Sequence, residues 1–328
     1  MTARRKILIG VGAGALVAQL PSFAQQQAGK IYRIGYLGGG WQTTVGRQFE
    51  ALRDELRVRG YVEGKNLIIE GRWAEGKYDR LPGLAAELVN LKADVLLTSG
   101  TPASQALKRA TMTIPIVVAS IGDIVSSGIV TNLARPGGNI TGSSYFSLEL
   151  YAKRLELLRD GFPQVRKVAI VLNPANLSGD PIFLVSQKAA KALKLEVRRF
   201  DIRSAQDFKS VFADIAKFRA DAAVIHQDAL LISNSKLFAE LAIKGRLLSI
   251  GFPEYADFGG LMGYGIDQID QYRRAAAFVD QILKGAKAGD IPIEQASKFE
   301  LIANRKTAKL IGVQFPDLIL QRVDRVID

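Results

Sequence analysis

The sequence predicts an α/β protein of two similar Rossmann-like lobes, each with a mostly parallel sheet, joined by a hinge that the chain crosses three times. Short apolar runs alternate along the chain with segments that carry apolar residues every three or four positions. Strands separated by helices need crossover connections, which make neighbouring strands parallel. The series also begins twice, because residues 167–172 correspond to 31–37 and the Ala-Asp-Ala at 220–222 corresponds to the Ala-Asp-Val at 93–95.

The chain has 328 residues, of which 48% are hydrophobic, so it is long enough for two globular domains with substantial cores. Connectors flanked by glycine or polar residues near positions 142, 265 and 296 give three crossings between lobes, an arrangement typical of a hinge. The predicted parts are a signal peptide at 1–24, one lobe from 30–143 plus 266–295, and a second lobe from 144–265 plus 296–328.

The first residues have the pattern of a secretory signal peptide. Arg4, Arg5 and Lys6 form a basic start, residues 7–20 are apolar, and small residues end at Ala24, where we expect cleavage. The apolar stretch of 14 residues is shorter than the roughly 20 that span a bilayer. We therefore expect a periplasmic protein, and the arginine pair leaves both the general and the twin-arginine export routes open.

The composition excludes several kinds of site. There is no cysteine, which excludes disulfides, thiolate metal sites and a lipid-anchored cysteine. His226 is the single histidine, so no histidine metal cluster is expected, and no cofactor is predicted. The formal net charge is +12, and loss of the three basic residues of the signal peptide lowers it to +9. The basic residues are spread along the chain, so we expect a surface property and no nucleic-acid partner.

The strands are predicted from apolar runs bounded by turn residues. They lie at residues 31–37, 67–70, 95–97, 115–120, 168–172, 195–200, 222–225, 247–250 and 299–302. Residues 140–144 and 261–265 contain several small residues and are predicted to be connectors.

The helices are predicted from apolar stripes at spacings of three and four. The first has Val45, Phe49, Leu52 and Leu56 on one face and ends near Gly60. Others are predicted near residues 81–91, 129–133, 148–158, 181–193, 237–241, 269–283, 304–311 and 316–326. One more begins at residue 101, and another runs from a capping box of Ser204 with Asp207 to residue 215.

The segment around residue 100 is the strongest candidate for a ligand contact. A short strand ends in Ser99 and Gly100, and Thr101 followed by Pro102 predicts a helix that Thr101 caps. The N–H groups at such a helix start suit a carboxylate, and loops at the carboxyl ends of parallel strands line the ligand crevice of open α/β sheets. The alternative is that Thr101 caps an ordinary helix.

Several runs resemble the ABC transporter substrate-binding protein family that includes tryptophan- and phenylalanine-binding members. They are residues 60–67, 72–76, 79–82, 100–103, 113–117, 133–142 and 306–313. The Gly-Tyr-Val-Glu-Gly and Ala-Arg-Pro-Gly-Gly-Asn runs are specific to that family, and the resemblance covers essentially the whole mature chain. It implies a type I periplasmic-binding-protein fold, two lobes that close on a small molecule, and delivery to a membrane permease. One departure is Ile124, because the family has Gly-Asp-Pro-Val where this chain has Gly122 to Val125.

In the first lobe the expected ligand contacts follow strand ends. Trp41 and Gln42 come after three glycines, and the indole either stacks on a planar ligand or covers apolar surface. Ser99, Gly100 and Thr101 are expected to bind a ligand carboxylate. Gly122 and Asp123 end the next strand and border the cleft, or Asp123 caps a helix.

In the second lobe Asn173 and Asn176 occupy the equivalent strand end, although an Asn-Pro turn also explains them. Asp228 is expected to pair with a ligand ammonium, or to cap the following loop. Tyr264 either contacts ligand or packs at the hinge. His226 is expected to be an interior histidine without a ligand role.

These features predict a monomeric periplasmic solute-binding protein without catalytic activity, which captures an amino-acid-like or aromatic molecule for an ABC permease. The alternatives are a secreted α/β hydrolase and a ligand-sensing receptor domain. The hydrolase is disfavoured because the sequence contains neither a Gly-x-Ser-x-Gly motif nor a P-loop, and it indicates no histidine partner for a serine nucleophile. A receptor would need a DNA-binding or membrane-spanning segment, and the sequence predicts neither.

Overall fold

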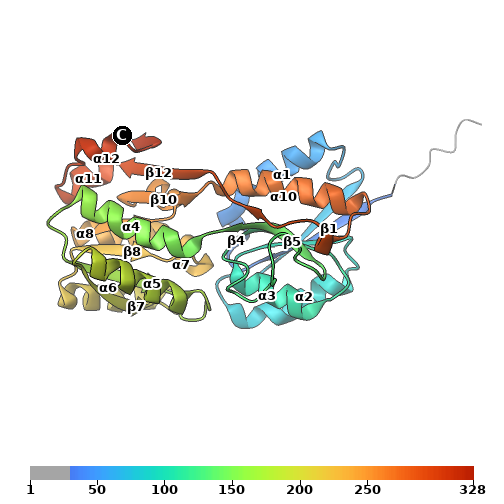
Figure 1. Cartoon of the computed structure of the whole chain (residues 1–328), viewed down its shortest axis with the longest axis horizontal. Helices are drawn as coiled ribbons and strands as arrows, with labels where there is room; N and C mark the ends of the chain where they lie inside the picture. The colour runs from blue at the N-terminus through green and yellow to red at the C-terminus, as the bar shows by residue number, and fades with distance from the viewer. Residues whose placement is uncertain (1–29) are drawn as a thin grey trace, which may run out of the picture. The chain divides into compact units, whose positions relative to one another are not determined.

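The computed structural model describes residues 30–328, and the predicted signal peptide lies outside the described residues. Ile31–Asp328 form one compact unit that contains two β-sheets with helices packed against them (Figure 1). Within these residues, no helix combines the length and apolar character that a membrane crossing requires.

The first sheet is entirely parallel, with strand order β11-β5-β4-β3-β1-β2. Its strands are β1 (Tyr32–Gly38), β2 (Leu67–Trp73), β3 (Val95–Ser99), β4 (Ile116–Gly122), β5 (Ile140–Tyr145) and β11 (Glu294–Gln295).

The second sheet has the order β13-β12-β10-β9-β8-β6-β7, and only β12 runs antiparallel to its neighbour β10. Its strands are β6 (Lys167–Leu172), β7 (Glu196–Asp201), β8 (Ala222–Ile225), β9 (Leu248–Gly251), β10 (Met262–Ile266), β12 (Phe299–Asn304) and β13 (Arg325–Ile327). When the strands of each half are numbered from its own start, both sheets contain the order 5-4-3-1-2, so the predicted internal repeat is confirmed.

The helices divide between the two sheets. Those against the first sheet are α1 (Gly46–Val58), α2 (Leu81–Asn90), α3 (Thr101–Ala110) and α10 (Gln268–Leu283), with the 3-10 turns η1 (Gln42–Val45), η2 (Tyr78–Arg80) and η3 (Ala288–Asp290). Those of the second are α4 (Ser147–Gly161), α5 (Gly179–Ala192), α6 (Asp207–Phe218), α7 (Ala229–Ser233), α8 (Ser235–Lys244), α9 (Pro253–Asp257), α11 (Arg305–Ile311) and α12 (Asp317–Leu320).

The chain passes three times between the two sheets. It leaves the first sheet after β5 to form α4, returns after β10 to form α10, and leaves again between β11 and β12. Although α10 comes late in the chain, it lies beside α1 and packs against β3, β4 and β5 of the first sheet (Figure 1). The predicted α/β fold with two similar lobes and three crossings is confirmed.

Both faces of each sheet are buried, as expected for parallel strands with helices on both sides. In β1, Ile34 and Tyr36 join the apolar cluster under α1 and α10, whereas Leu37 joins the cluster on the opposite face with α2 and α3. In β3, Val95 belongs to the first cluster and Leu96 to the second, which is the period of two that a strand requires.

Two predicted connectors are strands. Residues 140–144 lie in β5 and 261–265 lie mostly in β10. Small residues suggested loops at both places, but they are required there for close packing. A Cβ on Gly142 would lie 2.0 Å from the carbonyl oxygen of Val118, and one on Gly263 would lie 2.7 Å from that of Pro253.

Two predicted helices are also wrong. Residues 129–133 are irregular, and Ile129 and Val130 are buried beside the sheet without a helix. Three apolar residues in five positions cannot distinguish a helix from a loop that covers a core. The helix predicted for 316–326 ends at Leu320, because the chain then turns to place β13 parallel to β12.

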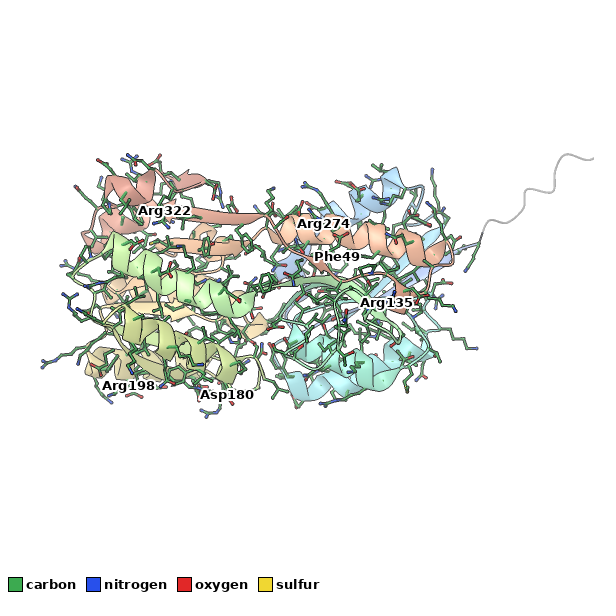
Figure 2. The ribbon with its side chains drawn as sticks, viewed as in Figure 1. Phe49, Arg135, Asp180, Arg198, Arg274 and Arg322 are labelled. Atoms are coloured by element: carbon green, nitrogen blue, oxygen red, sulfur yellow. The ribbon has the colours of Figure 1, made fainter. Side chains whose placement is uncertain are left out.

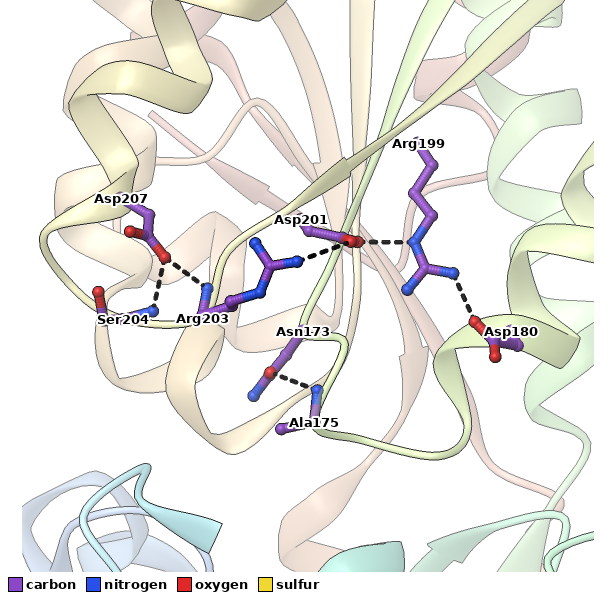
Figure 3. Close-up of polar contacts among 8 residues, drawn as sticks. All are labelled: Asn173, Ala175, Asp180, Arg199, Asp201, Arg203, Ser204 and Asp207. Atoms are coloured by element: carbon purple, nitrogen blue, oxygen red, sulfur yellow. Dashed lines mark hydrogen bonds and ion pairs between the residues drawn. The ribbon is translucent and has the colours of Figure 1, made fainter. Parts of the chain in front are cut away.

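The capping box predicted for Ser204 and Asp207 is half formed. The Asp207 carboxylate accepts hydrogen bonds from the backbone N–H groups of Ser204, at 3.0 Å, and Arg203, at 2.8 Å (Figure 3). The cap position is Gln206, which makes no side-chain cap. The half box still stabilises the turn that enters α6.

The basic residues of α5 and β7 are solvated, as predicted. Lys188, Lys191 and Arg198 are exposed, and Arg198 lies at the surface of this lobe (Figure 2). Arg199 is the exception, because it forms ion pairs with Asp180 and Asp201 (Figure 3). Arg198 also lies over the Phe218 ring, with its guanidinium carbon 4.3 Å from the ring centroid.

Candidate functional site

One large cavity lies where strands of both sheets end. Its volume is about 540 Å³, within the range typical of small-molecule sites. Residues after β1, β3 and β4 line it from the first lobe, and residues after β6, β8 and β9 line it from the second. The strand order reverses at β1 and β3 and again at β6 and β8, so the cavity lies at the switch point of each sheet.

The first lobe presents the start of α3 to this cavity. The cap position is Gly100, whose φ of 78° favours glycine, and it makes no side-chain cap. Thr101 is therefore the first helical residue, and the prediction that Thr101 caps the helix is wrong. The N–H groups of the first turn have no partner inside a helix, so those of Thr101 and Ala103 suit an anionic group.

Aromatic side chains form the floor of the cavity in the first lobe. Tyr36 and Tyr272 line it, and Phe49 of α1 lies behind them in the core. Phe49 packs edge-on against Tyr36 at 4.7 Å between ring centroids and also contacts Tyr272. The Tyr36 and Tyr272 hydroxyls lie 2.8 Å apart, and the Tyr272 hydroxyl lies 3.1 Å from Ser99 Oγ. Burial raises the pKa of both tyrosines, so they remain neutral. This floor offers ring surface together with fixed hydroxyl groups.

Asp228 is the most highly coordinated carboxylate at the cavity, and it is only 2% exposed. Its Oδ1 accepts hydrogen bonds from Asn173 Nδ2 and the Leu230 N–H, both at 3.0 Å. Its Oδ2 accepts from Asn176 Nδ2 at 2.9 Å and from the Tyr78 hydroxyl at 2.6 Å. Four protein donors therefore occupy the two oxygens.

The turn after β6 orients the two asparagine amides. Asn173 Oδ1 accepts the Ala175 N–H at 3.0 Å (Figure 3). This bond leaves its NH₂ group to donate to Asp228. Asn176 Oδ1 accepts from Ser178, through the backbone N–H at 3.2 Å and the hydroxyl at 2.8 Å. The two asparagines therefore form the turn predicted from the Asn-Pro sequence, and they also donate hydrogen bonds to Asp228.

Two contacts join the lobes across the cavity. Tyr78 lies in η2 of the first lobe and donates to Asp228 in the second. Arg47 at the start of α1 lies 3.9 Å from Asp257 at the end of α9. The lobes are therefore bonded to each other directly in this structure.

A serine and the single histidine also meet at the cavity. Ser178 Oγ lies 3.0 Å from His226 Nε2, although the sequence indicated no histidine partner for a serine. The Ser178 hydroxyl donates to Asn176 Oδ1, so His226 Nε2 must donate to Ser178. The histidine is thus in the wrong tautomer to take the serine proton, and no carboxylate holds its Nδ1, which has no partner among the described residues.

We expect His226 to make the folded protein sensitive to acid. Burial lowers its pKa from 6.5 to about 4. As the pH falls from 6.5 to 4, the unfolded chain gains a proton that the folded chain does not, so stability is lost over this window. Relative to His226→Gln, the free energy of unfolding should fall by about 1.4 kcal/mol per pH unit there, and urea titrations at each pH measure it. Parallel curves for the two proteins would contradict the assignment.

Glu254, in the first turn of α9, is a further titratable group in the cavity wall. Burial raises its pKa from 4.5 to about 7. A hydrogen bond from its own backbone N–H and the charge of Arg47 oppose this shift, whereas the charge of Asp257 adds to it. No side chain among residues 30–328 forms a hydrogen bond or ion pair with its carboxyl group. Glu254 is therefore available to a bound molecule.

The structure brings together about half of the predicted site residues. Those that line the cavity are Ser99, Gly100, Thr101, Gly122, Asn176 and Asp228. Asn173 does not line the cavity itself, but it donates a hydrogen bond to Asp228, which does.

The other predicted residues lie away from the cavity surface. Trp41 packs against Gly76 and against the apolar cluster that contains Leu230 of α7, which matches the alternative that it covers apolar surface. Gln42 is exposed in η1. Asp123 accepts the Ser126 N–H at 3.0 Å and so closes a turn. Tyr264 stacks on Phe299, and both rings are half-buried beside a small apolar cluster.

Sequence reasoning missed several cavity residues. They include Tyr36, Tyr78, Tyr145, Tyr151, Gln227, Glu254 and Tyr272. Gln227 directly follows His226 at a strand exit, and position alone could have indicated it. The tyrosines are spread over helices and strands, so only the folded chain brings them together. Among residues 30–328, no group of three or more histidine, aspartate or glutamate side chains is arranged to hold a metal ion.

A sequence model described as ABC transporter substrate binding protein matches residues 44–327. A curated relative, the tyrosine-binding protein of Clostridioides difficile (strain R20291), is 27% identical over 261 residues, which cover 79% of this chain and 74% of the relative.

Solved structures match the fold. A conserved domain protein of Vibrio cholerae O1 biovar eltor gives a TM-score of 0.85 with 26% identity, over 90% of this chain and 100% of that one. An ABC domain from Streptococcus pneumoniae in complex with L-Trp gives a TM-score of 0.83 with 24% identity, over 91% of this chain and 100% of that one.

Proposed function

Because the chain belongs to the ABC transporter substrate-binding protein family, we propose that it captures a small zwitterionic aromatic molecule between its lobes and presents it to an ABC permease. The cavity carries this proposal. It joins a helix start with free N–H groups to an aromatic floor and to acceptor groups on the opposite wall. A carboxylate, a ring and an ammonium would each have a partner of matching chemistry.

The proposed lobes are residues 30–143 plus 266–295 and residues 144–265 plus 296–328. The packing of α10 against the first sheet and the pairing of β11 with β5 support this division. Closure of the lobes on a ligand would bury it, and a permease would recognise that closed state.

In this proposal Ser99, Gly100, Thr101 and Gly122 bind the ligand carboxylate. The protein works as a monomer in the periplasm after export by the segment 1–24, and it catalyses no reaction. The names of the tyrosine-binding relative and of the tryptophan-bound structure support an aromatic amino acid as the ligand class.

Thermal unfolding in the presence of a panel of amino acids and aromatic acids tests the proposal. A ligand bound only by the folded protein at 100 times its Kd should stabilise it by about 2.7 kcal/mol. We expect a rise in Tm with an aromatic amino acid and none with sugars or phosphates. If no panel member raises the Tm, while esters or phosphates are hydrolysed, the protein is an enzyme and the proposal is wrong.

A further inference from the structure

The second-lobe wall of the cavity contains acceptor groups that receive no hydrogen bond from another side chain of residues 30–328. Strands β8 and β9 are parallel neighbours, so the residues after them meet at one edge of the sheet. Gln227 follows β8 and Glu254 follows β9, and both line the cavity. Gln227 Oε1 is buried and has no hydrogen-bond partner within residues 30–328. A buried acceptor without a partner is costly unless a ligand supplies the donor. The Glu254 carboxyl is half-buried and is bonded only by its own backbone N–H, so it retains acceptor capacity for a ligand.

Asp228 is poorly suited to the same task, although it lies on this wall. Its two oxygens already accept four hydrogen bonds from Asn173, Leu230, Asn176 and Tyr78. A ligand ammonium would have to displace one of these donors. The Tyr78 contact, at 2.6 Å, instead makes Asp228 a carboxylate that ties the lobes together.

We propose that Glu254 is the counter-ion for a ligand ammonium, that Gln227 Oε1 accepts a second hydrogen bond from it, and that Asp228 is a positioning residue. The ligand class is therefore a primary amine with a carboxylate at the other end. This assignment rests on the proposed function, since it concerns the ligand of the same cavity. An ammonium group has donors only, which matches a wall of acceptors.

Proton release should accompany binding. Burial raises the pKa of Glu254 to about 7, and the charged groups that act on it are Asp257 on its own helix, Arg47 from α1 and Asp267 before α10. A bound ammonium favours the ionised carboxylate and so lowers this pKa. Affinity should therefore rise by roughly tenfold from pH 6 to pH 8, as the ligand no longer has to displace a proton.

Calorimetric titration of the whole mature protein tests the assignment with two matched pairs of probes. The amines are L-tyrosine and L-tryptophan, and their analogues without the amine are 3-(4-hydroxyphenyl)propionate and indole-3-propionate. We expect the wild type to prefer at least one amine over its analogue by more than about tenfold. Glu254→Gln should reduce that preference to less than about threefold and abolish the pH dependence. Glu240→Gln, on the exposed face of α8, is the control and should change neither.

The outcomes separate the two proposals. If the wild type binds an amine and Glu254→Gln keeps its full preference, the Glu254 assignment is overturned and the proposed function stands. Equal binding of amine and analogue by the wild type also overturns the assignment alone. If the wild type binds none of the four probes, the proposed function and this inference both fail. The Tm of ligand-free Glu254→Gln shows whether the variant is folded, and Gln227→Leu, expected to weaken amine binding by several-fold, tests the wall independently.

Discussion

Gly142→Ala is expected to destabilise the protein by about 4 kcal/mol or more, because a side chain at this position collides with the backbone of the neighbouring strand. Gly142 pairs with Val118 in the register of β4 and β5, where the pairing is irregular. Its φ is 138°, and an added Cβ would lie 2.0 Å from Val118 O and 2.7 Å from Val118 N. Neither strand can move aside, because both are buried.

Urea unfolding followed by circular dichroism measures this effect, and Gly83→Ala is the matched control. Gly83 lies in α2, and a Cβ there would meet no atom within 4 Å. Alanine in a helix is more stable than glycine by about 0.5–1 kcal/mol, so Gly83→Ala should stabilise the protein slightly. A Gly142→Ala protein as stable as the wild type would show that β5 does not approach β4 as described.

Much of the fold follows from local patterns. The apolar stripe of Phe49, Leu52 and Leu56 predicts α1 because a helix repeats every 3.6 residues, and all three residues are buried. The two-lobe repeat was visible because each half starts with the same sequence of strands and helices. Patterns of this kind depend on neighbours in the chain, and these are the features that a sequence contains directly.

The strands β5 and β10 could not be predicted in the same way. Gly142 and Gly263 favour a loop by their own conformational freedom, whereas their real constraint is contact with backbone far away in sequence. Such contacts exist only in the folded chain. The polar character of Thr141, Ser143 and Ser144 reinforced the error, since all three are buried in β5.

The same distinction between local patterns and contacts far apart in sequence applies to the candidate site. Residues 99–101, Asn176 and Asp228 each follow the end of a strand, so the rule for parallel sheets places them at the cavity. The roles of the carboxylates did not follow from position. Asp228 was predicted to meet a ligand ammonium, and its four protein donors come from three separate segments of the chain. Glu254 was not singled out, because only its position at the cavity distinguishes it from other glutamates.

Asp228→Ala is expected to cost about 3–5 kcal/mol in the free energy of unfolding, because it leaves buried donors without an acceptor. The amides of Asn173 and Asn176 and the N–H of Leu230 would lose their partner, and the Tyr78 hydroxyl would lose its bond across the cavity. Chemical denaturation measures the loss.

Two further variants are needed to interpret the effect of Asp228→Ala. Tyr78→Phe removes only the hydrogen bond from Tyr78 to Asp228 and should cost about 1 kcal/mol, so the difference from Asp228→Ala reports the donors within the second lobe. Asp214→Ala is the control for loss of an aspartate in this lobe. Asp214 is exposed on α6 and pairs only with Lys217 across one helical turn, so its removal should cost no more than about 0.5 kcal/mol. If Asp228→Ala is no more costly than Asp214→Ala, the four hydrogen bonds do not hold the carboxylate, and Asp228 becomes free to meet a ligand ammonium as the sequence predicted.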